Sequence, residues 1–311
     1  MTVSNPYERD NSEVHRATVE GRPVYLKHYV PGGWLQTPEI ICSQAAREVE
    51  IATRLASVPG LSERLGRIKV VEADPAQALV VTAEVPGAVL QETLRFGGNR
   101  SLRGTCVRAL FVAGKWLNFF QTLPTDSQVV VSAPSDPENL LDYCHLRLKT
   151  LNELGYHWPN QRATRNVLEW LQRHIEATPE TQLAKVWCHG DYGPSNMIWD
   201  GRVLTPIDFA TCKLDLPLVD LTYLIHRLEI IPAQFPWRNW PVKLWRKACL
   251  RGYGMPDADR LPIYQALMVR HMLCRLQTLV RRPPVSRRQR WHNAWMRYWV
   301  RVKLSSLLRQ S

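Results

Sequence analysis

The chain has 311 residues, of which 45% are hydrophobic and 22% charged, and it carries a formal net charge of +12. This composition is typical of a globular protein and excludes an intrinsically disordered chain. No apolar run reaches the roughly 20 residues that a bilayer span requires, which argues against a transmembrane helix. The N-terminus is polar and has no hydrophobic signal segment, so we expect a cytoplasmic protein.

The excess positive charge belongs to the C-terminal end of the chain. Residues 260–311 contain twelve of the 40 Lys and Arg residues and none of the 28 Asp and Glu residues. The preceding residues therefore contain 28 basic and 28 acidic residues and carry no net charge. This separation predicts that a basic surface is built by the last elements of the fold.

The seven cysteines predict reduced thiols. Their number is odd and no two stand in a C-x-x-C pair, which disfavours a disulfide framework or a structural zinc site. Cys188 lies beside His189 and so suggests a thiol nucleophile. Because it closes an apolar strand, we interpret it instead as a core residue.

A β-hairpin is the first predicted element. Residues 13–30 alternate in polarity on both sides of a turn at Glu20-Gly21-Arg22-Pro23. Lys27 lies in the second strand. Taken alone, a lysine at such a position is ordinarily a solvated surface residue.

A helix and two more strands complete a small mixed lobe. The spacing of apolar residues predicts a helix over 43–55, in which Glu48 flanks the buried side. Strands are expected over 67–71 and 78–82. The Val85-Pro86-Gly87 segment then breaks the pattern, and we place a domain boundary there, giving domains 1–87 and 88–311.

The second domain is predicted to be mostly helical. Apolar residues recur with helical periodicity in seven segments. These segments are 102–123, 139–154, 163–177, 218–230, 245–253, 261–280 and 287–308.

One loop between two apolar strands concentrates the polar residues. Asp191 and Asn196 lie on this loop with four residues between them, and Asp208 ends the apolar run that follows. Carboxylate and carboxamide oxygens suit a hard divalent metal ion, and a carboxylate also orients a hydroxyl nucleophile. The pattern therefore favours a metal-dependent group transfer.

The motif His189-Gly190-Asp191-x-x-x-x-Asn196, followed by Ile207-Asp208-Phe209, resembles the aminoglycoside phosphotransferase and choline kinase-like family. Weaker matches at Arg47-Glu48 and Leu250-Arg251-Gly252-Tyr253 extend the resemblance over most of the chain. It implies an α+β, two-lobed protein-kinase-like fold. A small mixed N-lobe would bind nucleotide, and a larger, mostly helical C-lobe would carry the catalytic and acceptor-binding residues.

The resemblance also implies roles for the central residues. Asp191 would be the catalytic base that orients the acceptor hydroxyl and accepts its proton. Asn196 and Asp208 would hold Mg²⁺. His189 would be structural, fixing the loop by hydrogen bonds. The implied reaction is transfer of the γ-phosphate of ATP to a hydroxyl of a small molecule.

The nucleotide site is implied in the N-lobe. Lys27 would contact the α- and β-phosphates of ATP, and Glu48 would fix it through an ion pair, with Glu50 as the alternative partner. The backbone at Ala83 and Val85 would hydrogen-bond the adenine.

Two departures from the protein-kinase pattern limit this prediction. No G-x-G-x-x-G precedes Val14, so we expect a shortened nucleotide loop built on Asn11-Ser12. Phe209-Ala210-Thr211 replaces the usual Phe-Gly, which favours a small-molecule kinase over a protein kinase. Because the loop glycines are missing, a pseudokinase or nucleotide-sensing binding module is the alternative.

The last predicted helix combines arginines with aromatic residues. Trp291, Trp295, Tyr298 and Trp299 recur at helical spacing, so we expect an aromatic stripe packed on the helical lobe. A second interpretation is contact with an anionic membrane surface at the inner face, with a lipid-linked sugar as substrate. No nucleic-acid recognition motif accompanies the charge. The charge also disfavours a polycationic aminoglycoside as substrate.

Overall fold

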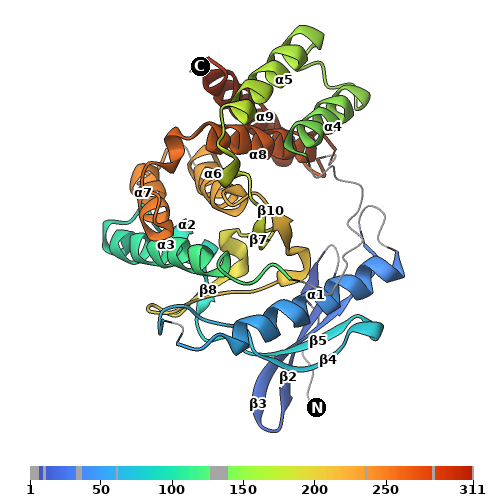
Figure 1. Ribbon diagram of the computed structural model, residues 1–311, viewed down its shortest axis with the longest axis vertical. Coiled ribbons are helices and arrows are strands. Elements are labelled where there is room, and N and C mark those ends of the chain that lie inside the picture. Colours follow the sequence, from blue (N-terminus) through green and yellow to red (C-terminus); the bar gives the residue numbers. More distant parts are fainter. Residues whose placement is uncertain are drawn as a thin grey trace.

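The structure is a computed structural model that describes residues 7–9, 12–32, 37–60, 62–126, 139–234, 237–281 and 284–309. It consists of a mixed N-terminal lobe, at the bottom of Figure 1, and a larger helical lobe above it. Two small sheets lie between them and carry the polar loop. The predicted α+β architecture is therefore present.

The N-terminal lobe is an antiparallel sheet with one helix packed against it. Its strand order is β1-β2-β3-β5-β4. The strands are β1 (Tyr7–Arg9), β2 (Ser12–Val19), β3 (Arg22–Tyr29), β4 (Val70–Asp74) and β5 (Leu79–Ala83). Helix α1 (Pro38–Ser57) lies across the sheet in Figure 1. Apolar residues of both elements form the core between them, including Ile41, Ala45 and Val80.

The β2–β3 hairpin confirms the first predicted element. Val19 pairs with Arg22, so Glu20 and Gly21 alone form the turn. Both have positive φ angles, of 50° and 76°, as a two-residue turn that matches the strand twist requires. Glycine adopts this backbone region at no steric cost.

Strand β4 does not have the predicted bounds. It runs over Val70–Asp74, whereas the sequence pattern predicted 67–71. The Asp74 side chain accepts hydrogen bonds from the amides of Ala76 and Gln77, which caps the 3₁₀ turn that follows. The turn therefore begins only after Asp74, and the strand extends up to it.

Helices build the second lobe, and all seven predicted helical segments are present with ends that differ by a few residues. A short helix after residue 89 was not predicted. The helices are α2 (Leu90–Arg95), α3 (Arg100–Phe120), α4 (Leu140–Glu153), α5 (Gln161–Glu176), α6 (Val219–Gln234), α7 (Val242–Tyr253), α8 (Pro262–Arg281) and α9 (Arg287–Leu307). The division into domains 1–87 and 88–311 stays a prediction.

Helices α3 and α7 lie side by side in Figure 1 and approach each other unusually closely. A Cβ atom at Gly252 would lie 2.0 Å from the carbonyl oxygen of Phe111, and one at Gly114 would lie 2.3 Å from that of Cys249. Only glycine permits this contact between backbones. It fixes the base of the helical lobe beneath the central loop.

Two small antiparallel sheets frame the central loop. One pairs β7 (Val186–Cys188) with β10 (Lys213–Asp215). The other has the order β6-β8-β9, formed by β6 (Ala88–Val89), β8 (Met197–Trp199) and β9 (Leu204–Pro206). Beneath the loop, the rings of Trp116 and Tyr192 stack at 5.8 Å between centroids. The loop thus rests on a rigid aromatic core.

Helix α9 packs on the helical lobe mainly through residues outside the predicted aromatic stripe. Its buried residues are Asn293, Met296, Val300 and Leu304, which recur every three or four positions. The predicted aromatic stripe is divided. Trp291 is 79% exposed and Tyr298 is 59% exposed, whereas Trp299 packs partly buried against the core and the indole of Trp295 donates a hydrogen bond to the carbonyl of Ala233. The expected packing of the helix on the lobe is present, but the stripe takes only a part in it.

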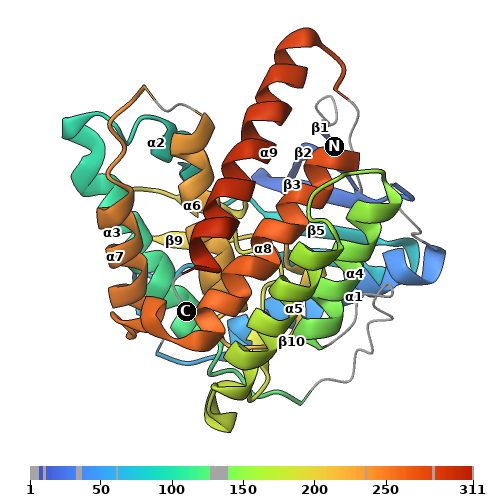
Figure 2. The same ribbon diagram turned by 90° about the horizontal axis from the view of Figure 1, so that it is seen from above.

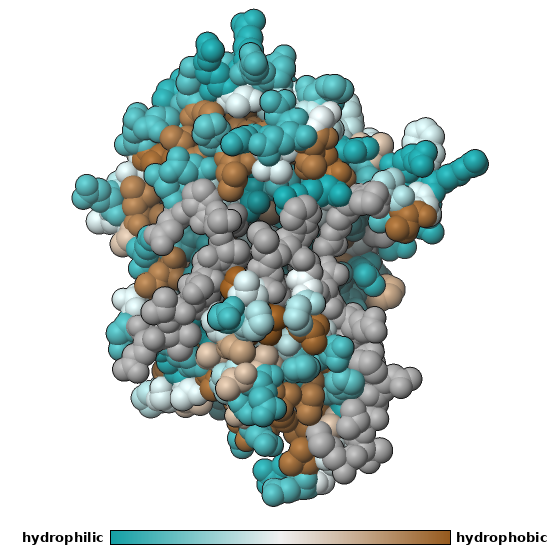
Figure 3. Space-filling view, turned by 90° about the vertical axis from the view of Figure 1, so that its right-hand side faces the viewer, coloured by the Kyte–Doolittle hydropathy of each residue, from teal (hydrophilic) through white to brown (hydrophobic). Residues whose placement is uncertain are grey.

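The surface of the helical lobe is mixed in character. On the face shown in Figure 3, hydrophilic side chains cover most of its upper part and hydrophobic patches lie between them. Within the described ranges, none of the helices has the length and apolar character needed to cross a membrane. All seven cysteines are free thiols, and five of them are buried.

Candidate active site

The loop between β7 and β8 brings Asp191 and Asn196 together. The side-chain amide of Asn196 donates hydrogen bonds to the backbone carbonyl of Asp191, at 3.0 Å, and to its Oδ2, at 2.8 Å. The hydroxyl of Tyr223, on α6, donates to the other carboxylate oxygen at 2.6 Å. Asp191 is half-buried. Its carboxylate is therefore held in one orientation at the edge of the cleft.

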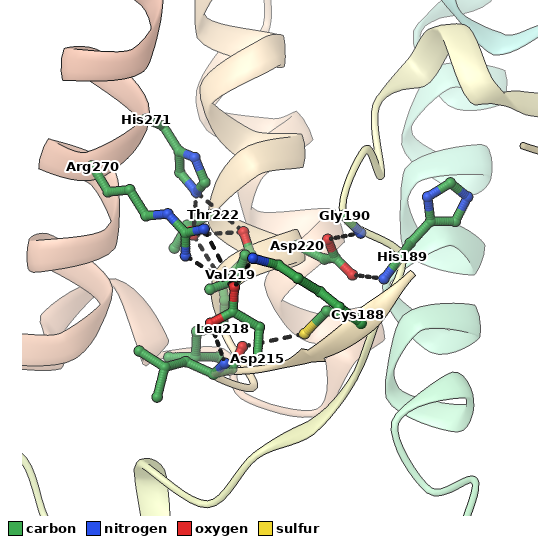
Figure 4. Close-up of polar contacts among 12 residues, drawn as sticks. Cys188, His189, Gly190, Asp215, Leu218, Val219, Asp220, Thr222, Arg270 and His271 are labelled. Carbon is green, nitrogen blue, oxygen red and sulfur yellow. Dashed lines mark hydrogen bonds and ion pairs between the residues drawn. The ribbon is translucent and has the colours of Figure 1, made fainter. Parts of the chain in front are cut away.

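A buried carboxylate on α6 fixes the start of this loop. Asp220 accepts hydrogen bonds from the backbone amides of His189 and Gly190, the latter at 3.0 Å, as Figure 4 shows. Burial raises the pKa of Asp220 to about 6, although the nearby His189 and the two amide hydrogen bonds oppose this shift. Asp220 therefore anchors the start of the loop to α6.

Gly190 is required by the same turn. Its φ angle is 82°, and a Cβ atom at this position would lie 2.4 Å from the carbonyl oxygen of Thr211. Both the left-handed backbone and the close approach exclude a side chain. Glycine is therefore required for steric reasons at the second position of His189-Gly190-Asp191.

His189 holds the loop from beneath. The ring is fully buried, its Nε2 lies 3.1 Å from the carbonyl oxygen of Ile207, and it packs against Phe209 with 4.9 Å between centroids. It does not contact the Asp191 carboxylate by any hydrogen bond among the described residues. The expectation of a structural role agrees with this position.

Asp208 follows β9 in the left-handed backbone region, with a φ angle of 70°. Its Oδ1 lies 2.6 Å from the ammonium group of Lys27. The amide of Ile207 donates to the carbonyl of Asn196 at 3.0 Å, which ties the Asp208 segment to the loop. The two predicted metal ligands thus stand on segments that are directly hydrogen-bonded to each other.

Lys27, on β3, also forms the expected ion pair with Glu48 of α1, at 3.0 Å. Burial alone would lower the pKa of Lys27, but the adjacent carboxylates of Glu48 and Asp208 outweigh it and the pKa is raised. The hydroxyl of Tyr29 donates to the same oxygen of Glu48. Glu50, the alternative partner, does not reach Lys27: it pairs with Arg47 at 2.7 Å.

A cavity of about 420 Å³ lies between the lobes and connects these groups. Lys27, Glu48 and Asp208 line one end of it. Its walls are mostly apolar and come from both lobes: Val14, Ile68, Val80, Val89, Ile198 and Ile207. This size and character suit a flat heterocycle with a charged tail, because apolar walls bury the ring while the polar end receives charge.

Ala83 and Val85 line the other end of the cavity, as expected for the adenine contacts. The amide of Ala83 is already used, because it donates to the carbonyl of Lys69 at 2.8 Å. Only the carbonyl of Ala83 is therefore left for the adenine. The amide of Val85 makes no backbone hydrogen bond within the described ranges. The predicted nucleotide loop includes Asn11, which lies outside the described residues.

The donor set fits a magnesium ion. The side-chain nitrogen of Asn196 donates to Asp191, which leaves its Oδ1 as a neutral oxygen ligand. The Asp208 carboxylate stands on the segment that is hydrogen-bonded to the Asn196 backbone through Ile207. Mg²⁺ is usually held by one or two such protein oxygens, with phosphate and water completing the shell. Among the described residues, no group of three or more His, Cys, Asp or Glu side chains forms an alternative metal site.

Two tyrosines and one arginine of the site were not predicted. Tyr223 stands three residues after Asp220, so one turn of α6 presents both to the loop. That spacing is the only sequence signal for it. Tyr29 lies two positions after Lys27, on the same face of β3. Arg227 follows Tyr223 by a further turn of α6.

The fold is shared with known phosphotransferases. A choline/ethanolamine kinase family protein from Mesorhizobium loti is 17% identical, with a TM-score of 0.59 over 99% of this chain and 91% of that chain. The aminoglycoside phosphotransferase APH(2'')-IIa, solved with streptomycin and ATP, is 13% identical, with a TM-score of 0.59 over 100% and 92%. The amicoumacin kinase hAmiN, solved with AMP-PNP and Ca²⁺, is 16% identical, with a TM-score of 0.61 over 97% and 88%.

These likenesses confirm the two-lobed protein-kinase-like fold. Among curated proteins, no sequence matches. The family itself is identified from the sequence, because residues 9–264 match the profile of a phosphotransferase enzyme family. The match spans both lobes and includes the loop with Asp191 and Asn196. The chain belongs to the phosphotransferase enzyme family.

Proposed function

We propose that the protein is an ATP- and Mg²⁺-dependent kinase that phosphorylates a hydroxyl group of a small molecule. One observation carries the proposal. Lys27, Asp208, Asn196 and Asp191 follow one another from the charged end of an apolar cavity to the cleft edge. Family membership and relatives solved with ATP or AMP-PNP support the same conclusion.

The proposed reaction is an in-line phosphoryl transfer. The acceptor hydroxyl donates a hydrogen bond to Asp191, its oxygen attacks the γ-phosphorus, and the bond to the ADP oxygen breaks. The hydroxyl proton passes to the Asp191 carboxylate. Tyr223 and Asn196 keep that carboxylate aimed at the acceptor. Asn196 and Asp208 would hold Mg²⁺, which neutralises charge on the phosphate oxygens when bound.

Lys27 has a separate role in this proposal. Its ammonium group lies at the charged end of the cavity between Glu48 and Asp208. We assign it to the α- and β-phosphates, with Glu48 fixing its position and Tyr29 fixing Glu48. The carbonyl of Ala83 and the amide of Val85 are assigned to the adenine edge.

The Asp191→Asn variant tests the proposal. It removes the base but keeps the size of the side chain, so we expect kcat to fall by about 10²–10⁴-fold. Stabilisation of the fold by MgAMP-PNP should persist, because Asp191 does not line the nucleotide cavity. ADP release and thermal unfolding measure the two properties. Turnover equal to that of the wild type would contradict the assignment.

The same measurements decide between a kinase and a nucleotide-sensing module. The missing glycine loop favours the module, whereas the preassembled loop around Asp191 favours catalysis. A module would be stabilised by MgATP yet release no ADP with any acceptor. A protein that neither binds nor turns over MgATP would contradict both.

The exposed face of α9 supports a second candidate, a kinase that works at a membrane surface. Trp291, Tyr298 and Val302 are exposed there among arginines, a combination that suits the interface of an anionic bilayer. The acceptor would then be a lipid-linked sugar, and the enzyme would be cytoplasmic and peripheral at the inner membrane face.

Co-sedimentation tests this second candidate. We expect binding to vesicles that contain phosphatidylglycerol at low salt, and weaker binding to pure phosphatidylcholine vesicles. Trp291→Ser combined with Tyr298→Ser should reduce the bound fraction, because it removes interfacial aromatic rings while leaving the buried face of α9 unchanged. Equal sedimentation with both vesicle types would count against an electrostatic membrane contact.

A further inference from the structure

Arg227 stands beside the catalytic loop without a counter-ion. It lies four residues after Tyr223 on α6, so both side chains project from the same face of the helix. A Cβ atom built on Gly193, in the loop, would lie 3.9 Å from the Cγ of Arg227. Arg227 is half-buried and forms no hydrogen bond or ion pair with any residue in the described part of the chain.

Two other arginines that are shielded from solvent, the buried Arg47 and the half-buried Arg270, have carboxylate partners. Arg47 pairs with Glu50 at 2.7 Å, and Arg270 pairs with Asp215 at 3.2 Å. Holding a partly desolvated guanidinium without a partner is costly. Arg227 has no such partner among the described residues, and it lies beside the loop that carries Asp191. The missing partner is therefore expected from the substrate.

Further positive charge lies near His226, the residue that precedes Arg227 on α6. Arg275 of α8 and Lys303 of α9 act together with Arg227 on the buried His226. Helices α8 and α9 contain no acidic residue. The nearest acid along α6, Glu229, is already paired with Lys303 at 3.6 Å and with Arg246. Glu229 therefore does not serve as the ion-pair partner of Arg227 among the described residues.

The position of Arg227 separates it from the nucleotide. None of the residues lining the 420 Å³ cavity comes from α6. Arg227 shares a face of α6 with Tyr223, whose hydroxyl donates to Asp191, and we therefore assign it to the acceptor side of the loop. Guanidinium groups bind phosphate and carboxylate through two parallel hydrogen bonds, which fixes the orientation of the bound group as well as its charge.

We propose that the acceptor carries a phosphate or carboxylate group close to its reactive hydroxyl, and that Arg227 binds this group. The inference deepens the proposed kinase function and rests on it. It implies that the enzyme phosphorylates acceptors that carry negative charge, such as a sugar phosphate or the headgroup of an anionic lipid. A polycationic acceptor is disfavoured by the same charges.

A binding measurement that needs no knowledge of the acceptor tests the role of Arg227. The enzyme is first saturated with MgAMP-PNP, and inorganic phosphate is then titrated at constant ionic strength against chloride while thermal unfolding is followed. We expect phosphate to stabilise the wild type. In Arg227→Gln the half-effective phosphate concentration should rise about tenfold or more, because a charge-assisted hydrogen bond is lost.

Arg108→Gln is the matched control, since Arg108 is an exposed arginine on α3. It should behave like the wild type. Identical phosphate titrations of Arg227→Gln and the wild type would overturn the proposal, and so would the absence of phosphate stabilisation in the wild type. Loss of MgAMP-PNP stabilisation would instead contradict the kinase function, so the two failures are distinguishable.

Matched acceptor pairs then identify the source of the anionic group. The pairs are glycerol with glycerol 3-phosphate, N-acetylglucosamine with its 1-phosphate, and phosphatidylcholine vesicles with phosphatidylglycerol vesicles. We expect ADP release with charged soluble members if the acceptor is soluble, and with phosphatidylglycerol vesicles if it is a lipid. Arg227→Gln should raise KM for that acceptor and leave KM for ATP unchanged. Turnover confined to neutral or cationic acceptors would overturn the proposal.

Discussion

The two sides of the catalytic loop differ in how their charges are satisfied. On the nucleotide side, Lys27 is held between the carboxylates of Glu48 and Asp208. On the acceptor side, Asp191 is held by neutral donors and the adjacent Arg227 has no described counter-ion. The cation of the nucleotide side is therefore already paired within the protein, whereas Arg227 has no ion pair among the described residues. We propose that the substrate supplies this partner, so that specificity would be expressed on the acceptor side.

The largest expected effect comes from breaking the nucleotide side at Asp208. Asp208→Asn removes the charged oxygen ligand and one partner of Lys27. We expect kcat to fall by about 10³-fold, because stabilisation of the phosphate charge is lost. The Mg²⁺-dependent part of stabilisation by AMP-PNP should disappear as well, measured by thermal unfolding with and without Mg²⁺.

Comparing Asp208→Asn with Asp191→Asn distinguishes loss of a metal ligand from loss of the catalytic base. Asp191→Asn should keep the Mg²⁺-dependent stabilisation that Asp208→Asn loses. Asp257→Asn, at a turn residue outside the cleft, is the control for a charge change. If both cleft variants retained metal-dependent nucleotide binding, Asp208 would not be a metal ligand.

A smaller effect is expected from Tyr223→Phe on the acceptor side. The change removes only the hydroxyl that donates to Asp191 at 2.6 Å. A hydrogen bond to a charged group contributes about 1.5–3 kcal/mol, so losing the alignment should lower kcat about tenfold. KM for ATP should not change. Tyr298→Phe, at an exposed tyrosine of α9, is the control, and an effect of Tyr223→Phe on KM for ATP alone would contradict its placement.

The smallest effect concerns stability in acid, through His226. Burial, reinforced by Arg227, Arg275 and Lys303, lowers the pKa of His226 from 6.5 to about 3. At pH values between about 3 and 6.5, His226 is protonated in the unfolded chain but neutral in the folded protein. The free energy of unfolding therefore falls as the pH drops below 6.5, by about 1.4 kcal/mol per pH unit for one proton.

His226→Leu removes this titration. The pH dependence of the free energy of unfolding between pH 7 and 5, measured by urea denaturation, should become shallower by one proton. His145→Gln, at an exposed position of α4, is the control and should leave the slope unchanged. An unchanged slope in His226→Leu would mean that this residue does not titrate as its burial indicates.

The central loop and the helix positions were predictable because they depend on local spacing. Hairpin chemistry at Glu20-Gly21 and apolar periodicity in the helices are short-range signals. The ion pair between Lys27 and Glu48 joins two elements, and it was expected only through the family resemblance. Its presence here is a finding of the structure.

Contacts made by helix packing could not be predicted. Whether α9 presents Met296 or Trp291 to the lobe depends on the groove it meets, because both lie on helical periodicities. Likewise, Arg227 approaches Gly193 only because Asp220 and Tyr223 draw the first turns of α6 against the loop. The amide of Ala83 is occupied because it donates to the carbonyl of Lys69, which lies on another segment of the chain. The sequence around Ala83 gives no indication of this contact.

Under the proposed function, the contact between Lys27 and Asp208 would also set the order in which ligands bind. The protein's own ammonium group neutralises the carboxylate assigned to the metal, at 2.6 Å. A free Mg²⁺ ion would therefore compete with a tethered cation, whereas nucleotide phosphates would draw that cation away. Metal and nucleotide would then raise each other's affinity by the same factor, as linkage requires. The enzyme should bind Mg²⁺ alone weakly and take it up together with the nucleotide.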